Sequence, residues 1–340
     1  MANTSTQVTP DRVLQQMIMG FRLTQLLHVA AKLGIADELA QGPKSARELA
    51  AACKCDPDAL YRTLRALAHV GVLVEQNQQR FKLTPMGEYL REGVRGSLRG
   101  TAIMFGEPWL WNGYGQLLHS AQTGKAAFEH AHEKSITDYL RDHEDAAQLL
   151  DQADRASAEQ EMAGLLRACD FTGVSSVIDI GGGKGSLLRE LLSKYPKLQG
   201  TLFDLPHVVE NADAALKTGE LASRCTLSGG DMFEHVPAGG EVYLMKHVVR
   251  DLDDERAAQL LKKCREAMSP DARLVLFERL VAEPNESSET KLLDIDALAM
   301  FGGRLRTEYE HQALLDTAGL RLTHFRTTRG PLSILEAMPL

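Results

Sequence analysis

The spacing of apolar side chains changes about halfway along the chain. Residues 11–35 carry apolar side chains at helical spacing, from Val13 to Ala30. From Ser175 onwards the pattern becomes short apolar runs of strand length, at residues 176–180, 200–203, 225–227, 241–245, 273–277, 322–325 and 332–336. Helical segments separate the earlier runs. Short apolar strands that alternate with helices predict an α/β fold with a mostly parallel, doubly wound sheet.

Two helices and a hairpin are predicted between the first helix and residue 84. Ser45, with Glu48 three residues later, has the pattern of a helix-capping box. Asp56 precedes a second helix that Gly71 ends, and the residues that follow have the pattern of a short hairpin. Helix, helix and hairpin is the plan of a winged helix.

A winged helix can bind DNA through its second helix. Here that helix offers Arg62 and Arg65, but also Asp56, Asp58 and many apolar residues. The whole chain has a formal net charge of −8, whereas nucleic-acid binding needs a basic surface. We therefore expect no nucleic-acid partner, and we interpret residues 1–100 as a winged-helix dimerisation domain.

The next segment is helical and unusually rich in aromatic residues. Residues 98–168 include both tryptophans of the chain. Flat rings form good walls for flat ligands, so Phe105 and Trp109 are candidate substrate contacts. We expect residues 101–168 to form a helical linker that contributes to a substrate pocket, and residues 169–340 to form a Rossmann-like catalytic domain.

Composition narrows the class of protein. A chain of 340 residues with 44% apolar and 25% charged residues is typical of a soluble globular protein with two domains. No apolar run is long enough to cross a membrane, and the N-terminus lacks a signal-peptide pattern, so we expect a cytoplasmic location. The five cysteines are scattered and odd in number, which favours reduced thiols and no metal site.

A glycine-rich loop carries the sharpest chemical signal. It spans Gly181–Gly185, follows a predicted strand that contains Asp179, and opens a helix. Glycines allow a ligand to lie against bare backbone. Asp204 ends the second strand, where a carboxylate can accept hydrogen bonds from both ribose hydroxyls. Ser186 stands where a dinucleotide-binding loop has its third glycine, which argues against a dinucleotide.

Five motifs occur together in a fixed order, at residues 179–185, 203–207, 230–233, 243–254 and 302–307. Together they resemble the caffeate and hydroxyindole O-methyltransferase family, over nearly the whole chain. The resemblance implies a class I methyltransferase sheet, a homodimer, a small aromatic substrate, and S-adenosylmethionine (SAM) as the methyl donor that leaves as S-adenosylhomocysteine. By motif position the cofactor-binding residues would be Asp179, Gly181, Gly183, Asp204, Leu205, Asp231, Met232 and Lys246.

The catalytic motif departs from that family. The position of the family's proton-abstracting histidine holds Arg250. Of the two glutamates that flank the histidine in the family, one corresponds to Glu278 and the other to Leu305, while His247 lies at a different motif position. Arginine stays protonated in proteins, so Arg250 cannot remove a proton from a substrate.

Three interpretations follow from this departure. The acceptor oxygen is already acidic, or the acceptor is a ring nitrogen, or the protein binds SAM without transferring its methyl group and acts as a decarboxylase, hydroxylase or cyclase. The first suits Arg250 best, because a guanidinium beside an anionic oxygen stabilises it. We predict that Arg250 and Glu278 are catalytic, with Glu278 orienting Arg250. The alternative is that Arg250 only forms an ion pair with Glu278 or Asp251.

One further local similarity indicates a more specific class of substrate. Residues 230–232, 236–237, 240–244 and 251–253 are locally similar to phenazine methyltransferases, which also lack the histidine. We therefore expect methyl transfer to an oxygen, or alternatively a nitrogen, of a fused-ring aromatic secondary metabolite. Further substrate contacts are expected at Asp154, Ser157, Met300 and Phe301.

Overall fold

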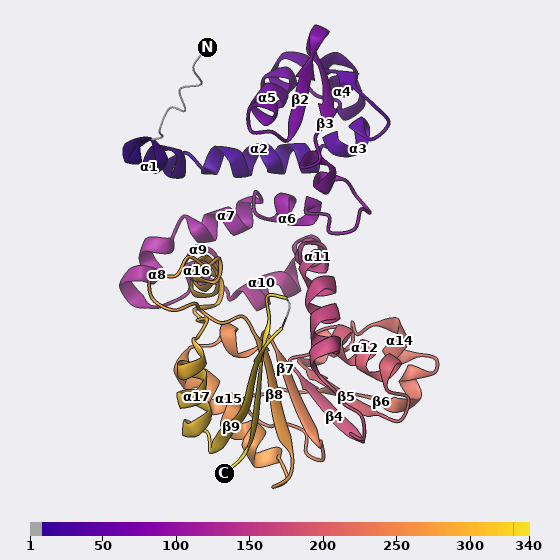
Figure 1. Cartoon of the computed structure of the whole chain (residues 1–340), viewed down its shortest axis with the longest axis vertical. Helices are drawn as coiled ribbons and strands as arrows, with labels where there is room; N and C mark the ends of the chain where they lie inside the picture. The colour runs from indigo at the N-terminus through magenta and orange to yellow at the C-terminus, as the bar shows by residue number, and fades with distance from the viewer. Residues whose placement is uncertain (1–8, 329) are drawn as a thin grey trace, which may run out of the picture. The chain divides into compact units, whose positions relative to one another are not determined.

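The computed structural model describes residues 9–328 and 330–340, with the side chains of residues 154–160 excepted. The chain divides into two compact units (Figure 1). One unit contains Met1–Asn112 and Thr137–Ala158, and the other contains Gly113–Ile136 and Glu159–Leu340. No helix among the described residues is long and apolar enough to cross a membrane.

The first unit begins with helices and a small antiparallel sheet. Its elements are α1 (Pro10–Ile18), α2 (Phe21–Lys32), α3 (Ile35–Leu39), β1 (Lys44–Ser45), α4 (Ala46–Cys53), α5 (Pro57–His69), β2 (Leu73–Gln76) and β3 (Arg80–Leu83). The strands pair in the order β1-β3-β2, which is the predicted winged helix. Apolar side chains of α2 to α5 and of the hairpin form one core.

Local capping explains where two of these helices begin. Ser45 Oγ accepts a hydrogen bond from the Glu48 N–H at 3.2 Å, and the Glu48 side chain accepts one from the Ser45 N–H, which confirms the capping box. The Asp56 carboxylate accepts from the Ala59 N–H at 2.8 Å and caps α5. The helical stretch expected over residues 11–35 is interrupted after Ile18, and Gly20 precedes the start of α2.

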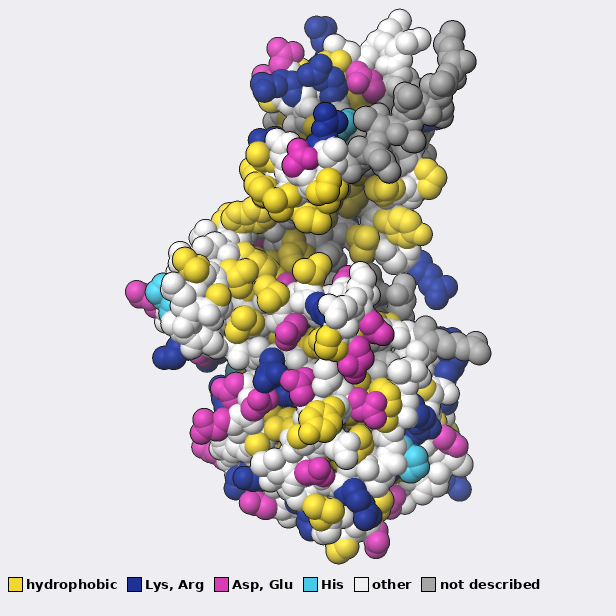
Figure 2. Space-filling view, turned by 60° about the vertical axis from the view of Figure 1, so that its left-hand side comes forward, with side chains coloured by type: hydrophobic (Ala, Val, Ile, Leu, Met, Phe, Trp, Pro, Cys, Tyr) yellow, Lys and Arg dark blue, Asp and Glu magenta, His cyan; other side chains and the backbone are white. Residues whose placement is uncertain are grey.

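The face of α1 is apolar and exposed. None of its residues is buried, and large apolar side chains such as Leu14, Met17 and Ile18 are open to solvent. Hydrophobic side chains gather on this face of the first unit (Figure 2). Burying such a face requires a partner surface.

A helical region connects the winged helix to the large sheet. It consists of α6 (Arg99–Met104), α7 (Pro108–Tyr114), α8 (Leu117–Thr123), α9 (Ala127–His132), α10 (Ile136–Asp142) and α11 (Glu144–Ala168). Its elements are shared between the two units. All five cysteines of the chain lie among the described residues, and none of them forms a disulfide.

The second unit contains a seven-stranded sheet in the order β6-β5-β4-β7-β8-β10-β9. The strands are β4 (Ser176–Ile180), β5 (Gln199–Asp204), β6 (Cys225–Gly229), β7 (Val242–Lys246), β8 (Arg273–Glu278), β9 (Leu320–Thr327) and β10 (Ser333–Pro339). Strands β4 to β8 pair in parallel, whereas β10 runs antiparallel to both of its neighbours. This is the class I methyltransferase sheet that was expected.

Helices cover the sheet and supply its two apolar layers. They are α12 (Ser186–Lys194), α13 (Pro206–Val209), α14 (Ala214–Lys217), α15 (Asp254–Ala267) and α17 (Glu308–Thr317). Helix α16 (Thr290–Phe301) packs against α8 and α9 instead. The strand order reverses direction between β4 and β7. In doubly wound sheets, ligands bind at this switch point, beyond the carboxyl ends of the strands.

Candidate active site

The glycine-rich loop leaves β4 at this switch point and leads into α12. Gly181, Gly183 and Gly185 all have positive φ angles, of 64°, 59° and 82°. A Cβ atom at Gly182 would lie 2.6 Å from Asp179 Oδ2, so a side chain there would collide with the carboxylate. A Cβ built at Gly183 would meet no described atom within 4 Å. The loop therefore presents bare backbone towards open space at Gly183.

Two carboxylates lie at the ends of the strands beside this loop. Asp204, at the end of β5, accepts hydrogen bonds from the N–H groups of Gly183 at 2.8 Å and Leu205 at 2.7 Å. Asp179 is buried, and neither carboxylate oxygen has a hydrogen-bond partner among the described residues. Burial raises the pKa of Asp179 to about 7, Asp204 adds to that shift, and Lys246 opposes it.

The remaining predicted cofactor residues follow the neighbouring strands. Asp231 and Met232 lie two and three residues after the end of β6. The Asp231 carboxylate accepts from the Phe233 N–H at 2.8 Å, and Met232 is partly buried against the core. Lys246 is the last residue of β7. The structure thus brings acids, an apolar side chain and a cation to one edge of the sheet, around an exposed loop backbone. This donor and acceptor set fits a nucleoside with an amino-acid tail.

A buried ionic cluster beside Lys246 was not predicted from the sequence. Glu161 on α11 is buried and forms ion pairs with Lys246 at 2.9 Å and Arg279 at 2.8 Å. It also contacts His247 Nε2 at 3.0 Å. Burial opposes ionisation of Glu161, but His247, Lys246 and Arg279 together hold its pKa well below the usual range. Burial also lowers the pKa of His247 to about 4, so His247 is neutral at physiological pH.

Nothing in the linear pattern distinguishes Glu161 from exposed acids of α11 such as Glu144 and Asp145. Its partners lie more than 80 residues away along the chain, so only the fold identifies it. His247 has a φ angle of 61°, a conformation that is uncommon for a residue other than glycine. Its contact with Glu161 helps to stabilise that backbone.

Arg250 lies on the short helix η4 (Val249–Asp251), which follows β7. Its Nε atom is 3.5 Å from Asp251 Oδ1, and the side chain is about one-third exposed. Glu278, at the end of β8, is fully buried, and its Oε1 atom accepts a hydrogen bond from the Val249 N–H at 3.1 Å. Burial raises the pKa of Glu278 to about 8, and the charge of Arg250 opposes that shift. Glu278 therefore holds the backbone of η4 and is neutral near pH 7.

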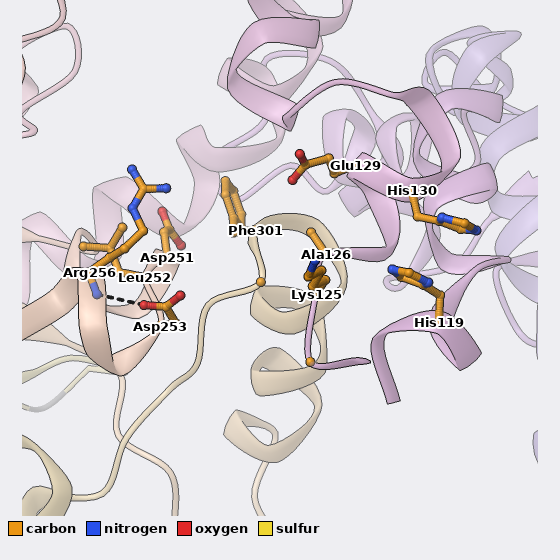
Figure 3. Close-up of a pocket in the computed structure, with 12 residues that line it drawn as sticks. His119, Lys125, Ala126, Glu129, His130, Asp251, Leu252, Asp253, Arg256 and Phe301 are labelled. Carbon is orange, nitrogen blue, oxygen red and sulfur yellow. Dashed lines mark hydrogen bonds between the residues drawn. The ribbon is translucent and has the colours of Figure 1, made fainter. Parts of the chain in front are cut away.

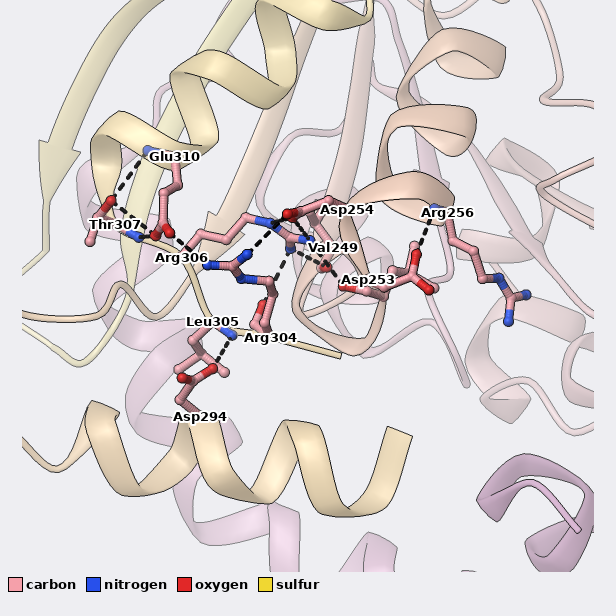
Figure 4. Close-up of polar contacts among 11 residues, drawn as sticks. Val249, Asp253, Asp254, Arg256, Asp294, Arg304, Leu305, Arg306, Thr307 and Glu310 are labelled. Carbon is pink, nitrogen blue, oxygen red and sulfur yellow. Dashed lines mark hydrogen bonds and ion pairs between the residues drawn. The ribbon is translucent and has the colours of Figure 1, made fainter. Parts of the chain in front are cut away.

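A buried arginine, Arg306, fixes the other side of η4 (Figure 4). The Arg306 guanidinium donates to the carbonyls of Val249 at 2.8 Å and Leu252 at 3.0 Å, and twice to one oxygen of Asp254. Leu305 is buried, and its N–H donates to Asp294 at 2.7 Å. The segment that carries Arg250 is thus held from both sides.

An open cleft of about 350 Å³ begins at Asp251, the last residue of η4 (Figure 3). Asp251 and Arg256 line one side, and His119 and His130 line the other, with Phe301 between them. The two imidazole rings stack with their centroids 4.0 Å apart. The cleft therefore has both aromatic and charged walls. Phe301 lines it, and its role as a wall of the substrate pocket stays a prediction.

The other predicted substrate contacts are distributed differently. Met300 is buried, and a Cβ atom at Gly113 would lie 3.2 Å from its Cε atom. Phe105 and Trp109 belong to the first unit, where Trp109 is buried and stacks on Tyr139 at a centroid distance of 5.9 Å. The side chains of Asp154 and Ser157 lie outside the described residues. A role in substrate binding remains a prediction for all of them.

Comparison with known families identifies both parts of the chain. Residues 114–321 match an O-methyltransferase domain, and residues 15–93 match an O-methyltransferase dimerisation domain. The chain is 38% identical to a phenazine O-methyltransferase of Lysobacter antibioticus over 338 residues, which are 99% of both chains.

Two solved structures extend this likeness. A mitomycin 7-O-methyltransferase aligns with a TM-score of 0.91 and 34% identity, over 97% of this chain and 98% of that one. An O-methyltransferase from neocarzinostatin biosynthesis, solved with SAM and 2-hydroxy-5-methyl naphthoic acid, aligns with a TM-score of 0.84 and 28% identity, over 94% and 96% of the two chains. The chain therefore belongs to the O-methyltransferase family and is a SAM-dependent O-methyltransferase.

Proposed function

We propose that this enzyme methylates an acidic hydroxyl oxygen of a small, fused-ring aromatic secondary metabolite, such as a hydroxylated phenazine. We further propose that it works as a homodimer in the cytoplasm. The similarity to a phenazine O-methyltransferase and to an enzyme solved with a hydroxynaphthoic acid supports the substrate class. The observation that carries the proposal is Arg250, which stands where the resemblance places a proton-abstracting histidine.

The edge of the sheet around the glycine loop is proposed to hold the methyl donor. Asp204 would accept hydrogen bonds from the ribose hydroxyls, and Asp231 with Met232 would hold the adenine by its edge and its face. Lys246 would lie alongside the cofactor. SAM, when bound, supplies a methyl group on a positively charged sulfur and leaves as S-adenosylhomocysteine. The chain's own contribution is to align the acceptor and exclude water.

The electrostatics around Arg250 support an anionic acceptor. Glu278 is buried with its pKa raised to about 8, so at neutral pH it does not cancel the positive charge of Arg250. Asp251 Oδ1 lies 3.5 Å from the Arg250 Nε atom, and the side chain of Arg250 is about one-third exposed to solvent. A cation within about 4–6 Å lowers the pKa of a hydroxyl by about 1–3. Arg250 would therefore favour substrates whose hydroxyl ionises easily.

The proposed homodimer rests on the first unit. Met17 on α1 is 71% exposed, and the apolar side chains around it are open as well. The match to a dimerisation domain begins at residue 15, so it covers the C-terminal half of this helix and the whole winged helix. A second copy of the chain is the partner that suits such a face, because one small winged-helix domain offers too little apolar surface to cover it.

A panel of hydroxyaromatics incubated with methyl-labelled SAM tests the function. The panel contains a hydroxyphenazine, its methyl ether as a blocked control, and a simple phenol with a pKa near 10. We expect the hydroxyphenazine to gain one labelled methyl group for each S-adenosylhomocysteine formed, and to react faster than the simple phenol. Label on nitrogen in place of oxygen, or turnover without S-adenosylhomocysteine, would contradict the proposal.

A further inference from the structure

A tyrosine and an aspartate that are remote in sequence meet beside Arg250. The Tyr114 hydroxyl, at the end of α7, donates a hydrogen bond to Asp296 Oδ1 on α16. Both side chains are half-buried, and both belong to the second unit. A phenol that donates to a carboxylate fixes the rotamer of that carboxylate and stabilises its charged form.

The packing of α16 places this pair near the reacting end of the site. Helix α16 packs against η4, which carries Arg250. A Cβ atom at Gly303 would lie 2.3 Å from the Arg250 carbonyl, so the chain just after α16 runs directly against η4. Met300, a predicted wall of the substrate pocket, lies one turn after Asp296 on the same face of α16.

Burial and three neighbouring side chains determine the pKa of Asp296. Burial raises its pKa, the Tyr114 hydrogen bond and the positive charge of Arg250 lower it, and Glu289 at the start of α16 raises it. The net direction is upward from the usual value. A carboxylate with a raised pKa is a better proton acceptor than an exposed one.

The other titratable side chains around Arg250 are engaged elsewhere. Glu278 is fully buried against the backbone of Val249 and is protonated below about pH 8. His247 uses Nε2 for Glu161, and its Nδ1 atom is buried. Asp251 is the ion-pair partner of Arg250.

We propose that Asp296, positioned by Tyr114, accepts the hydroxyl proton of the substrate, while Arg250 stabilises the oxygen anion that results. This inference rests on the proposed function and supplies the proton acceptor that Arg250 cannot be. The substrate O–H bond breaks and its proton binds a carboxylate oxygen of Asp296. The electron pair stays on the substrate oxygen, which bonds to the methyl carbon as the carbon–sulfur bond breaks towards sulfur. Asp296 then releases the proton to water.

The pH dependence of Asp296→Asn tests this role against a structural one. We expect kcat with a hydroxyphenazine to fall about 100-fold at two pH units below the pKa of that substrate, where only about 1% of the hydroxyl is already ionised. At a pH above the substrate pKa, where the hydroxyl arrives already ionised, the variant should approach the wild-type rate. A purely structural role would instead lower the rate by one factor at every pH.

Two further variants help to distinguish a proton-accepting role of Asp296 from a structural one. Asp294→Asn removes a carboxylate from the same helix, but its amide oxygen still accepts from the Leu305 N–H, so its profile should match that of the wild type. The rate of Tyr114→Phe should fall about tenfold at a pH below the substrate pKa and recover above it. This variant replaces Asp296→Asn in the test if Asp296→Asn unfolds at the assay temperature.

The outcomes separate this inference from the proposed function. A pH-independent loss in Asp296→Asn, or no loss at any pH, overturns the role of Asp296 while methylation by the wild type stands. Absence of methylated product from the wild type at every pH overturns the proposed function itself.

Discussion

The replacement of Arg306 by methionine gives the most direct structural prediction. Arg306 is 1% exposed, and its guanidinium donates to the carbonyls of Val249, the first residue of η4, and Leu252, which directly follows η4. Methionine fills a similar volume without any donor. The variant therefore removes the hydrogen bonds while it keeps most of the packing.

The expected loss can be worked out from these contacts. Each buried carbonyl left without a donor costs about 1–3 kcal/mol, so two of them cost roughly 2–6 kcal/mol. Asp254, the third partner, is 61% exposed and can bind water, so its loss adds little. We expect the free energy of unfolding to fall by about 3–5 kcal/mol, a large share of the total for an ordinary domain. Because η4 carries Arg250, kcat should fall as well.

Urea unfolding followed by circular dichroism, without SAM and at fixed protein concentration, measures this loss. Arg304→Met is the matched control. Arg304 is 45% exposed and forms its ion pairs with Asp254 and Glu310 at the surface, so its loss should cost about 1 kcal/mol or less. Equal losses in the two variants, or a loss below about 1 kcal/mol for Arg306→Met, would refute the view that Arg306 holds η4.

Three further predictions address the cofactor, the pH dependence and the oligomer. Asp204→Ala should weaken SAM binding about 100-fold in calorimetry, because two charge-assisted bonds of about 1.5 kcal/mol each are lost; unchanged affinity would contradict the ribose assignment. The folded pKa of Glu278, about 8, exceeds its ordinary value of 4.5, so its stabilising effect is complete below about pH 4.5 and is lost as the pH rises through 8. The melting temperature of Glu278→Gln should therefore rise relative to that of the wild type as the pH increases over that range. A constant difference in melting temperature would argue against a buried neutral carboxyl. Met17→Glu should yield monomers in light scattering, with the exposed Tyr309→Glu as control, and dimers of unchanged stability would exclude α1 from the interface.

Much of the fold followed from local sequence patterns. Apolar runs predicted each strand of the large sheet, and the caps at Ser45 and Asp56 predicted where α4 and α5 begin. These features depend on neighbouring residues along the chain, so the sequence alone carries them. The break between α1 and α2 was not predicted, although Gly20 is a weak helix former and could have signalled it.

Only those site residues that belong to recognisable motifs could be predicted from the sequence. The glycine loop and Asp204 lie at successive strand ends, and the resemblance assigned Arg250 to the reacting position. Glu161 and the Tyr114–Asp296 pair could not be predicted, because their partners are 85 or more residues away along the chain. No local pattern distinguishes a buried acid with distant cationic partners from an exposed one.

The pH dependence of kcat for the wild type and Arg250→Ala, on one hydroxyphenazine, tests the central claim most directly. The account predicts a lower rate in Arg250→Ala and a plateau reached at a pH about 1 unit higher or more, because the hydroxyl must ionise without the nearby positive charge. Arg304→Ala, an exposed arginine on the segment after α16, should keep the wild-type profile. If Arg250→Ala keeps both the wild-type rate and the wild-type plateau, Arg250 is only the ion-pair partner of Asp251, and the proposal of an anionic acceptor is contradicted.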